Sequence, residues 1–380
     1  NISLKIDKGA GLSIAAGATL TINGPLDAGP YQIFAGTGAV AGLKTSYLEW
    51  FGAIGDGTTD CAAAFTLAIN ASSVVEMLPN STYLIKAKAH AGIPSNKTIK
   101  GNGWTSVIKR DLTFFAPATD NIFTLATNAT HITFKDFSYN GNGTGTEGIN
   151  SAQFIETIAG GNHYLTINNV YFHDYTDLIF NGYGTCDYVR ITNNLFINSY
   201  FRGAMNFAGS YGLISDNKFY NMNDHCIDVI NFDYGIISNN LCFANGTVEP
   251  VNDAISVSYG NHLLITGNIC YTPTGSGIKI LAEDVAVVGR RTSGFNLQIT
   301  NNVVYAPAAS KMAITVEAMY AGVSIKNNNC LGSIYVSESN VVTISGNELY
   351  GDTGHIAIEA GSNINDIKIT GNTLYAPKDA

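Results

Sequence analysis

A short alternation of apolar and polar residues returns along most of the chain. A typical unit reads Ile, a polar residue, one further residue and then Asn, with an apolar residue two positions after the Asn. The Asn positions of this series are Asn169, Asn194, Asn217, Asn240, Asn268, Asn302, Asn328, Asn347 and Asn372. Successive members are 19 to 34 residues apart. A repeat of this length made of short alternating runs predicts a solenoid of parallel β-strands.

A second run in each unit has the form apolar-x-apolar, as in Ile227-Asp-Val229 and Ile278-Lys-Ile280. Because side chains alternate across a strand, the flanking residues point inward and the middle residue points outward. Coils stacked about 4.8 Å apart then bury one continuous core. The repeated Asn can hydrogen-bond to the backbone and to the Asn of the next coil, so we assign the series to architecture rather than to catalysis. The pattern predicts an all-β, single-stranded parallel β-helix.

Composition narrows the class further. A solenoid grows by adding coils, so all 380 residues are expected to form a single domain, residues 1–380. The net charge of −9 argues against a nucleic-acid partner, and no apolar run of about eighteen residues predicts a membrane span. Of the six Cys, Cys242 and Cys270 fall in one inward column and are expected to be free thiols. The sequence contains no Cys/His cluster of the kind that would predict a zinc site. No signal peptide begins the chain, so its targeting cannot be read from it.

Residues 60–71 break the strand pattern. Asp60 is placed to cap a first turn and helix-forming residues follow it, which predicts one short helix near residues 60–71. Just before this, residues 51–60 read Phe-Gly-Ala-Ile-Gly-Asp-Gly-Thr-Thr-Asp. With the helix and the later Ile99-Lys-Gly-Asn-Gly-Trp104, the segment resembles the opening of pectate-lyase-superfamily β-helix proteins, which include phage tailspikes and polygalacturonase-related glycosidases.

That resemblance implies a right-handed parallel β-helix that acts on an extracellular polysaccharide, but it does not imply a reaction. It divides the expected domain into N-terminal coils (1–46), the signature segment with its helix (47–110) and the main coils (111–380). It also implies an extracellular or virion-associated location and, from tailspikes, a homotrimer. An outward apolar strip of Leu213, Ile236 and Leu264 is the candidate interface. An insertion such as Asn140–Gly148 packing over that strip is the alternative.

The candidate chemistry gathers on the outward side of the second run. Its outward positions are expected to be Ile179, Asn206, Asp228, Ser256, Lys279, Thr315, Tyr335 and Ala357. Just before the same strands stand Arg202, Asp224, His225 and Asp253, and an insertion at 281–294 adds Glu283, Asp284, Arg290 and Arg291. Neighbouring coils should bring these charges together, because each coil adds only about 5 Å.

Glycoside hydrolysis needs a carboxylic acid and a second carboxylate roughly 5 to 10 Å apart. Asp228 and Asp253 on adjacent coils fit this requirement, with Asp224 as a substitute. Residues 223–229 resemble the Asn-Thr-Asp-Gly-Ile-Asp stretch of polygalacturonases. His225 replaces an Asp, Asn252 replaces the first Asp of the next pair, and Ser276 stands where a His is expected. We therefore expect a divergent glycosidase that cleaves an acidic polysaccharide and requires no cofactor, rather than a polygalacturonase itself.

Two other functions stay open. A lyase or uronate epimerase would use Lys279 or His225 as base, Arg202 or Arg290 to neutralise the uronate carboxylate, and Ca²⁺ held by Asp228 and Asp253. A non-catalytic polysaccharide-binding or adhesion protein would use the same face for affinity alone. In each case Arg202, Glu283, Arg290 and Arg291 are expected to contact the polymer. Tyr234 and Tyr259 are expected to stack on its sugar rings.

Overall fold

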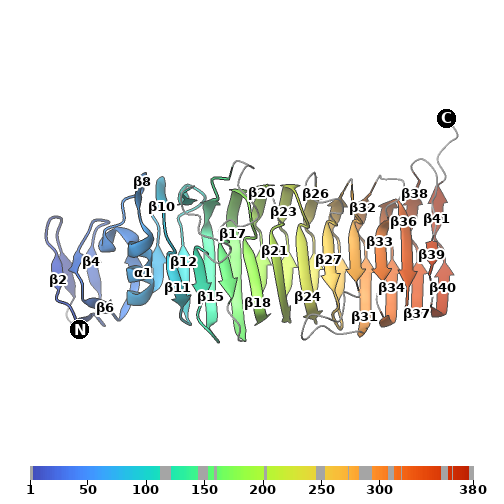
Figure 1. The fold of residues 1–380 in the computed structure, drawn as a ribbon, viewed down its shortest axis with the longest axis horizontal. Coiled ribbons are helices and arrows are strands. Elements are labelled where there is room, and N and C mark those ends of the chain that lie inside the picture. Colours follow the sequence, from blue (N-terminus) through green and yellow to red (C-terminus); the bar gives the residue numbers. More distant parts are fainter. Residues whose placement is uncertain are drawn as a thin grey trace.

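The computed structural model describes a long rod of coils whose strands cross its axis (Figure 1). The described residues are 3–111, 121–143, 153–157, 161–200, 203–244, 253–272, 274–281, 293–306, 312–317, 319–351, 358–361 and 363–375. Most strands pair in parallel with the strand three further along the chain, so each coil adds one strand to each of three faces. The fold is a right-handed parallel β-helix, as the repeat and the resemblance predict.

The first face carries the strands that precede the Asn turn. They are β7 (Leu43–Tyr47), β9 (Ser72–Glu76), β12 (Lys97–Lys100), β15 (Thr130–Asn140), β17 (Asn162–Tyr175), β19 (Arg190–Thr192), β22 (Leu213–Ser215), β25 (Ile236–Ser238), β28 (Leu264–Thr266), β31 (Ser293–Thr300), β34 (Met319–Lys326), β37 (Asn340–Ser345) and β40 (Asn365–Thr370).

The second face follows that turn, and the long strands β15 and β17 run through both faces. Its other strands are β8 (Asp56–Asp60), β10 (Ser81–Ile85), β13 (Ser106–Arg110), β20 (Leu195–Ser199), β23 (Lys218–Met222), β26 (Leu241–Ala244), β29 (Ile269–Tyr271), β32 (Val303–Tyr305), β35 (Asn329–Leu331), β38 (Glu348–Tyr350) and β41 (Thr373–Tyr375).

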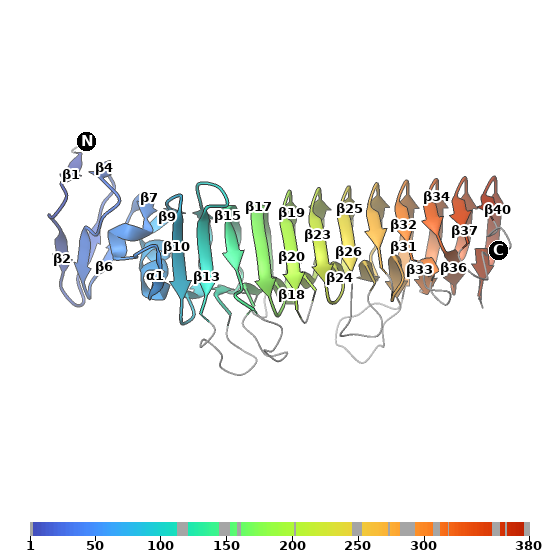
Figure 2. The same ribbon diagram turned by 90° about the horizontal axis from the view of Figure 1, so that it is seen from above.

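The third face carries the candidate site. Its strands are β11 (His90–Ile93), β14 (Phe123–Leu125), β16 (Ile155–Thr157), β18 (Phe180–Asp187), β21 (Met205–Ser210), β24 (Ile227–Asp233), β27 (Ile255–Ser258), β30 (Ile278–Leu281), β33 (Met312–Glu317), β36 (Ser333–Ser337) and β39 (Ile358–Ala360). Figure 2 shows the same stack turned by a quarter, with the strands of each face in a row along the axis.

Two smaller coils precede the main stack. They consist of β1 (Leu4–Ile6), β2 (Leu12–Ile14), β3 (Thr19–Thr21), β4 (Leu26–Ala28), β5 (Phe34–Gly36) and β6 (Ala39–Ala41). A 3₁₀ turn, η1 (Leu48–Phe51), and the helix α1 (Ala62–Ala71) lie between these coils and the main stack. The predicted helix is confirmed. The N-cap residue of α1 is Cys61 rather than Asp60. Asp60 lies one residue earlier and accepts the Ala62 backbone N–H at 3.1 Å, and Asp56 binds turn amides, so both carboxylates stabilise the turn before the helix.

The interior is one apolar core in which like residues stack on like. Phe172, Phe196 and Phe219 stack with ring centroids 5.0 and 4.6 Å apart, and all six Cys are buried and free, including the registered Cys242 and Cys270. The Asn series forms a buried ladder. The Asn240 amide nitrogen donates to the Ile214 carbonyl at 2.9 Å and to the Asn268 amide oxygen at 3.0 Å. The architectural assignment is therefore confirmed.

The predicted phase is wrong by one residue where the ladder begins. Asn169 has φ 53°, in the left-handed region that Asn193 also occupies. The backbone N–H of Val170 donates to the Asn194 amide oxygen at 2.9 Å, so Val170 takes the ladder position. Phe172, rather than Tyr171, then aligns with the inward Phe196. Two adjacent Asn, at 168 and 169, made the phase ambiguous in the sequence.

Candidate functional site

The third face carries an outward polar column through its middle. Strand register aligns Glu156, Asn181, Asn206, Asp228, Ser256, Lys279, Thr315, Tyr335 and Glu359. The column agrees with the prediction from Asn206 to Tyr335. At its start the prediction is wrong, because Ile179 is buried and Asn181 lies opposite Asn206. At its end Glu359 lies opposite Tyr335, and Ala357 is outside the described residues.

The turn before each of these strands brings the charged groups together. The register of β21, β24, β27 and β30 places Gly203, His225, Asp253 and Ser276 at equivalent positions of consecutive coils. A side chain at Gly203 would put its Cβ 1.8 Å from the carbonyl oxygen of His225. The glycine therefore lets the two coils approach closely at this point.

A small cleft of about 50 Å³ opens at this turn. It is lined by Leu178, Gly203, Met205, Asn206, Asp224, His225 and Asp228. Three of these residues, Asp224, His225 and Asp228, were predicted catalytic residues. The structure thus joins two carboxyl groups and one imidazole in a single depression on the third face.

Asp228 is half-buried on β24 beside its neighbour in the column. The Asn206 amide nitrogen donates to an Asp228 carboxylate oxygen at 2.5 Å. Burial raises the pKa of Asp228, and the nearby negative Asp224 adds to this effect; His225 and the Asn206 hydrogen bond oppose it without reversing it. A carboxyl group with a raised pKa keeps its proton to higher pH, as a general acid must.

His225 lies among three carboxylates. Its Nδ1 is 3.1 Å from both the backbone nitrogen and the carbonyl oxygen of Asp253, and its Nε2 is 3.8 Å from Asp224 Oδ1. Burial by itself lowers the pKa of His225, but the charges of Asp228, Asp224 and Asp253 outweigh burial, so the pKa of His225 is raised. The arrangement therefore favours the imidazolium form.

Asp253 and Lys279 sit behind this group. Asp253 is 2% exposed; one carboxylate oxygen accepts the Ser276 backbone N–H at 2.6 Å, and the other lies 4.0 Å from Lys279 Nζ. A buried carboxylate held in this way fixes the turn under His225. Asp224 has a side chain 27% exposed and lines the cleft, so it is better placed than Asp253 to meet a substrate.

The predicted polymer-contacting residues do not all join this cleft. Tyr259 is 2% exposed and packs in the core, so the prediction that it stacks on sugar rings is wrong. Tyr234 is exposed, but it follows the far end of β24 and its ring lies between those of Tyr211 and His262. Arg202, Glu283, Asp284, Arg290, Arg291 and Asn252 lie outside the described residues.

Sequence reasoning missed an exposed aromatic column at the turn between the third and first faces. Its members are His131, Tyr164, Tyr188, Tyr211, Tyr234 and His262, each stacked on the next with ring centroids 4.5 to 5.0 Å apart. All six have φ between 50° and 60°, a left-handed conformation that bulky residues rarely adopt. Because the ring faces cover one another, the column presents edges rather than free faces to a sugar.

Among the described residues, no group of three or more His, Cys, Asp or Glu is arranged to hold a metal ion. The predicted Ca²⁺ ligands Asp228 and Asp253 are engaged by Asn206 in one case and by Ser276 and Lys279 in the other. In the same described residues no helix is long and apolar enough to cross a membrane.

Neither a protein-family model nor a curated protein sequence matches the chain. Solved structures do match it. The DFA-IIIase of Arthrobacter chlorophenolicus A6 is 14% identical, with a TM-score of 0.64 over 89% of this chain and 100% of that one. The Dettilon tailspike protein is 13% identical, with a TM-score of 0.63 over 88% and 68%. The exopolygalacturonase of Thermotoga maritima is 13% identical, with a TM-score of 0.55 over 86% and 91%. These likenesses establish the fold alone, a right-handed parallel β-helix.

Proposed function

We propose that the chain binds an extracellular polysaccharide on its third face and hydrolyses it at the cleft of Asp224, His225 and Asp228. One observation carries the proposal: two carboxyl groups share a surface depression, and burial raises the pKa of one of them, Asp228. The fold likeness to an exopolygalacturonase and a tailspike supports a polysaccharide as the ligand class.

Each residue has a distinct role in this proposal. Asp228 donates its proton to the glycosidic oxygen while the bond to the anomeric carbon breaks. A water molecule attacks that carbon and gives its proton to the Asp224 carboxylate. His225, as imidazolium, offsets the negative charge that remains when Asp228 has lost its proton. Asp253 and Lys279 act as positioning residues, since the backbone carbonyl of Asp253 accepts the Nδ1–H of the His225 imidazolium.

The same geometry makes elimination the weaker alternative. A lyase or epimerase needs an unprotonated base, whereas the raised pKa of His225 favours imidazolium. The other candidate base, Lys279, faces the Asp253 carboxylate at 4.0 Å. Hydrolysis by two carboxyl groups requires no metal, so activity that survives a chelator supports hydrolysis. Activity that needs Ca²⁺ supports elimination.

The proposed substrate is extracellular, and we place the protein outside the cell or on a virion. The sequence led us to expect an acidic polymer. The cleft and the residues behind it hold three carboxyl groups, Asp224, Asp228 and Asp253, beside His225 and Lys279, so attraction of an acidic polymer would depend on Arg202, Arg290 and Arg291. A direct comparison of neutral and acidic polymers decides it.

We further propose a homotrimer, from the fold likeness to a tailspike. Leu213, Ile236 and Leu264 stack in register on the first face, and Ile236 is 39% exposed. Replacing Ile236 with Lys should lower the mass measured by light scattering if this strip is the interface. Replacing the exposed Lys368 of the same column with Glu provides a control. An unchanged mass of the Ile236→Lys protein would remove the strip from the interface.

The test of the proposed reaction is product analysis in heavy-oxygen water. The protein is incubated with plant, algal and bacterial-surface polysaccharides, and fragments are weighed by mass spectrometry. Hydrolysis adds one labelled water per cut, whereas elimination adds none and leaves an unsaturated end. Binding to a polymer without any fragment would instead identify an adhesion protein.

A further inference from the structure

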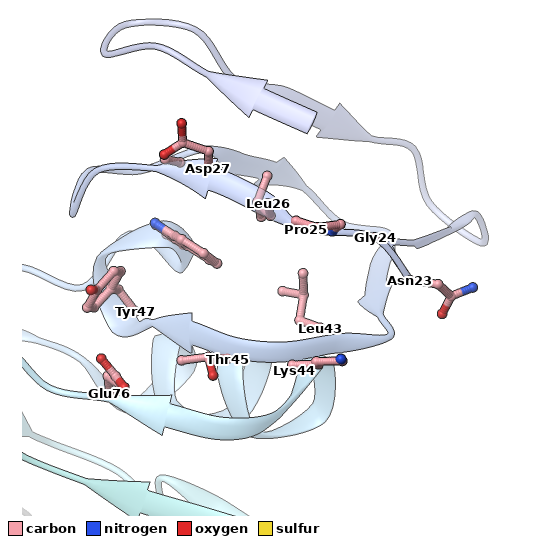
Figure 3. Close-up of a pocket in the computed structure, with 12 residues that line it drawn as sticks. Asn23, Gly24, Pro25, Leu26, Asp27, Leu43, Lys44, Thr45, Tyr47 and Glu76 are labelled. Carbon is pink, nitrogen blue, oxygen red and sulfur yellow. The ribbon is translucent and has the colours of Figure 1, made fainter. Parts of the chain in front are cut away.

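The N-terminal coils meet the main stack through an incomplete face. Within the described residues, β4 pairs only with β1, and β7 pairs only with β9. The pairing of each strand with the strand three further on therefore fails between β4 and β7. A cavity of about 560 Å³ lies in this place. In Figure 3, Leu26 and Leu43 lie between the two strands, and the lining residue Glu76 lies beyond β7 on β9. We call this cavity the N-terminal slot.

The floor of the slot is apolar and rigid. Leu26 on β4 and Leu43 on β7 face the space between the strands (Figure 3), and Trp50 from η1 lines it as well. The Trp50 indole N–H donates to the Gly29 carbonyl at 2.9 Å. Tyr47 meets the Trp50 ring edge to face, with centroids 5.5 Å apart. Trp50 is only 4% exposed, so it supports the floor of the slot and is fixed by its own contacts before any ligand arrives.

The side chains at the rim of the slot are polar, and most of them have no partner among the described residues. Asn23, Asp27, Lys44 and Thr45 line it, and none of these four side chains has a hydrogen bond or ion pair with another described residue. Glu76 differs, because its carboxylate pairs with Lys100 at 2.6 Å. The charged residues of the cleft on the third face differ from these rim residues. Asp228, Asp224 and His225 all have hydrogen-bond partners inside the protein. The rim groups of the slot are free to meet a ligand.

We propose that the N-terminal slot is a second, non-catalytic saccharide site that binds one or two neutral sugar units. Its volume lies within the range of about 300 to 1,000 Å³ that is typical of small-molecule sites. A sugar ring has apolar C–H faces and a belt of hydroxyls, which match an apolar floor and a rim of carboxylate, amide and hydroxyl groups. Asp27 can accept two neighbouring hydroxyls, and Asn23 can donate and accept.

Charge selects a neutral sugar. The free rim groups include one carboxylate, Asp27, and one ammonium, Lys44, and the Glu76 charge is already paired. The charge of Asp27 balances that of Lys44, so the free rim groups carry no net positive charge to attract an anionic sugar. The slot lies at the N-terminal end of the rod, whereas the cleft lies at β21 and β24 near its middle (Figure 1). The proposal does not depend on the reaction proposed for the cleft.

Tryptophan fluorescence tests the proposal directly. The chain has two Trp, and Trp104 is exposed and does not line the slot. In a Trp104→Phe protein, emission reports on Trp50 alone. The probes are glucose, galactose, mannose, N-acetylglucosamine, maltose and cellobiose. We expect at least one of them to change the Trp50 emission in a saturable way.

Variants at the rim decide where the sugar sits. In the Trp104→Phe background, Asp27→Ala and Thr45→Phe should each weaken binding at least tenfold, the first by removing an acceptor and the second by filling the slot. Asp7→Ala, an exposed carboxylate of the same coils outside the lining, should leave binding unchanged. Asp228→Asn should also leave it unchanged, which separates this site from the cleft. Saturable binding that resists both rim variants, or no change of emission with any probe, would overturn the proposal.

Discussion

Two stacked turns of this β-helix use polar side chains in opposite ways. In the Asn ladder, the same amide returns on consecutive coils, and each one satisfies its neighbours: Asn194, Asn217 and Asn240 bond in sequence at 2.9 and 3.0 Å. At the turn before the third-face strands, the equivalent positions hold Gly203, His225, Asp253 and Ser276, all different. In the ladder, repetition of one residue lets each amide bond to the next. At the second turn, which we call the varied turn, the residues differ from coil to coil and charged groups reach the surface.

The Asn ladder and the turn before the third-face strands also differ in their electrostatics. Amides carry no charge, so a buried ladder of them costs little once every donor and acceptor is paired. At the varied turn, Asp224, Asp228 and His225 lie close together. Burial and the charge of Asp224 raise the pKa of Asp228. Burial lowers the pKa of His225, but the charges of Asp228, Asp224 and Asp253 outweigh it, so the pKa of His225 is also raised. Shifted pKa values in a surface depression are typical of functional sites. Four substitutions test whether the two turns divide stability and chemistry in this way.

The largest expected effect is on activity. Asp228→Asn removes the proposed acid but keeps the shape of the side chain and its contact with Asn206. We expect kcat/KM for the polymer that is cleaved to fall about a thousandfold, with little change in melting temperature. The measurement is initial-rate kinetics on that polymer beside a thermal melt. Near-normal activity would remove Asp228 from the acid role.

Asn240→Ala should instead act on stability. The substitution removes an oxygen that accepts the Asn217 backbone N–H at 3.1 Å and its amide at 3.0 Å, and it leaves the buried Ile214 carbonyl without that donor. We expect a loss of about 3 to 5 kcal/mol in the free energy of unfolding, measured by denaturant titration. Asn372→Ala, at the less buried end of the ladder, should cost less than half as much. Equal losses at both positions would contradict the cooperative ladder.

Gly203→Ala connects the two effects. The added Cβ would lie 1.8 Å from the His225 carbonyl oxygen, so the coils must separate at the cleft. We expect a loss of about 2 kcal/mol in stability together with a fall in activity. Gly92→Ala on β11 of the same face is the matched control, because its Cβ meets nothing closer than 3.8 Å. A Gly203→Ala protein as stable and active as the control would show that the close approach is not needed.

The sequence predicted the parts of the molecule that depend on repetition. The coil pattern, the buried ladder, the free Cys column and the helix at Ala62–Ala71 follow from alternation and from residues that recur in phase. The sequence also predicted that five site residues lie close together, because residues one coil apart in the chain are only about 5 Å apart along the axis. These residues are Asp224, His225, Asp228, Asp253 and Lys279. The predicted phase was wrong at Asn169, where the ladder begins, and at both ends of the outward column, where Asn181 and Glu359 take the predicted places of Ile179 and Ala357.

The features that sequence reasoning missed depend on exceptions to repetition. The N-terminal slot exists because β4 and β7 fail to pair, and that depends on how η1 and α1 fill the junction. The aromatic column requires Tyr164, Tyr188 and Tyr211 to adopt a left-handed backbone that their side chains disfavour. Stacking on neighbouring coils offsets that cost, and it becomes visible only once the coil register is known.

The smallest expected effect is a shift in the pH profile. The Asn206 amide donates to the Asp228 carboxylate, and a hydrogen bond to the charged form lowers the pKa of that group. Asn206→Ala should therefore raise the pKa of Asp228 further. Because the acid must be protonated to act, the alkaline limb of kcat/KM should move to higher pH by about half a unit to one unit. Asn181→Ala, one coil earlier in the same column, should leave the limb in place. A limb that stays fixed or moves to lower pH in Asn206→Ala would assign it to a group other than Asp228, and the varied turn would then lose its proposed acid.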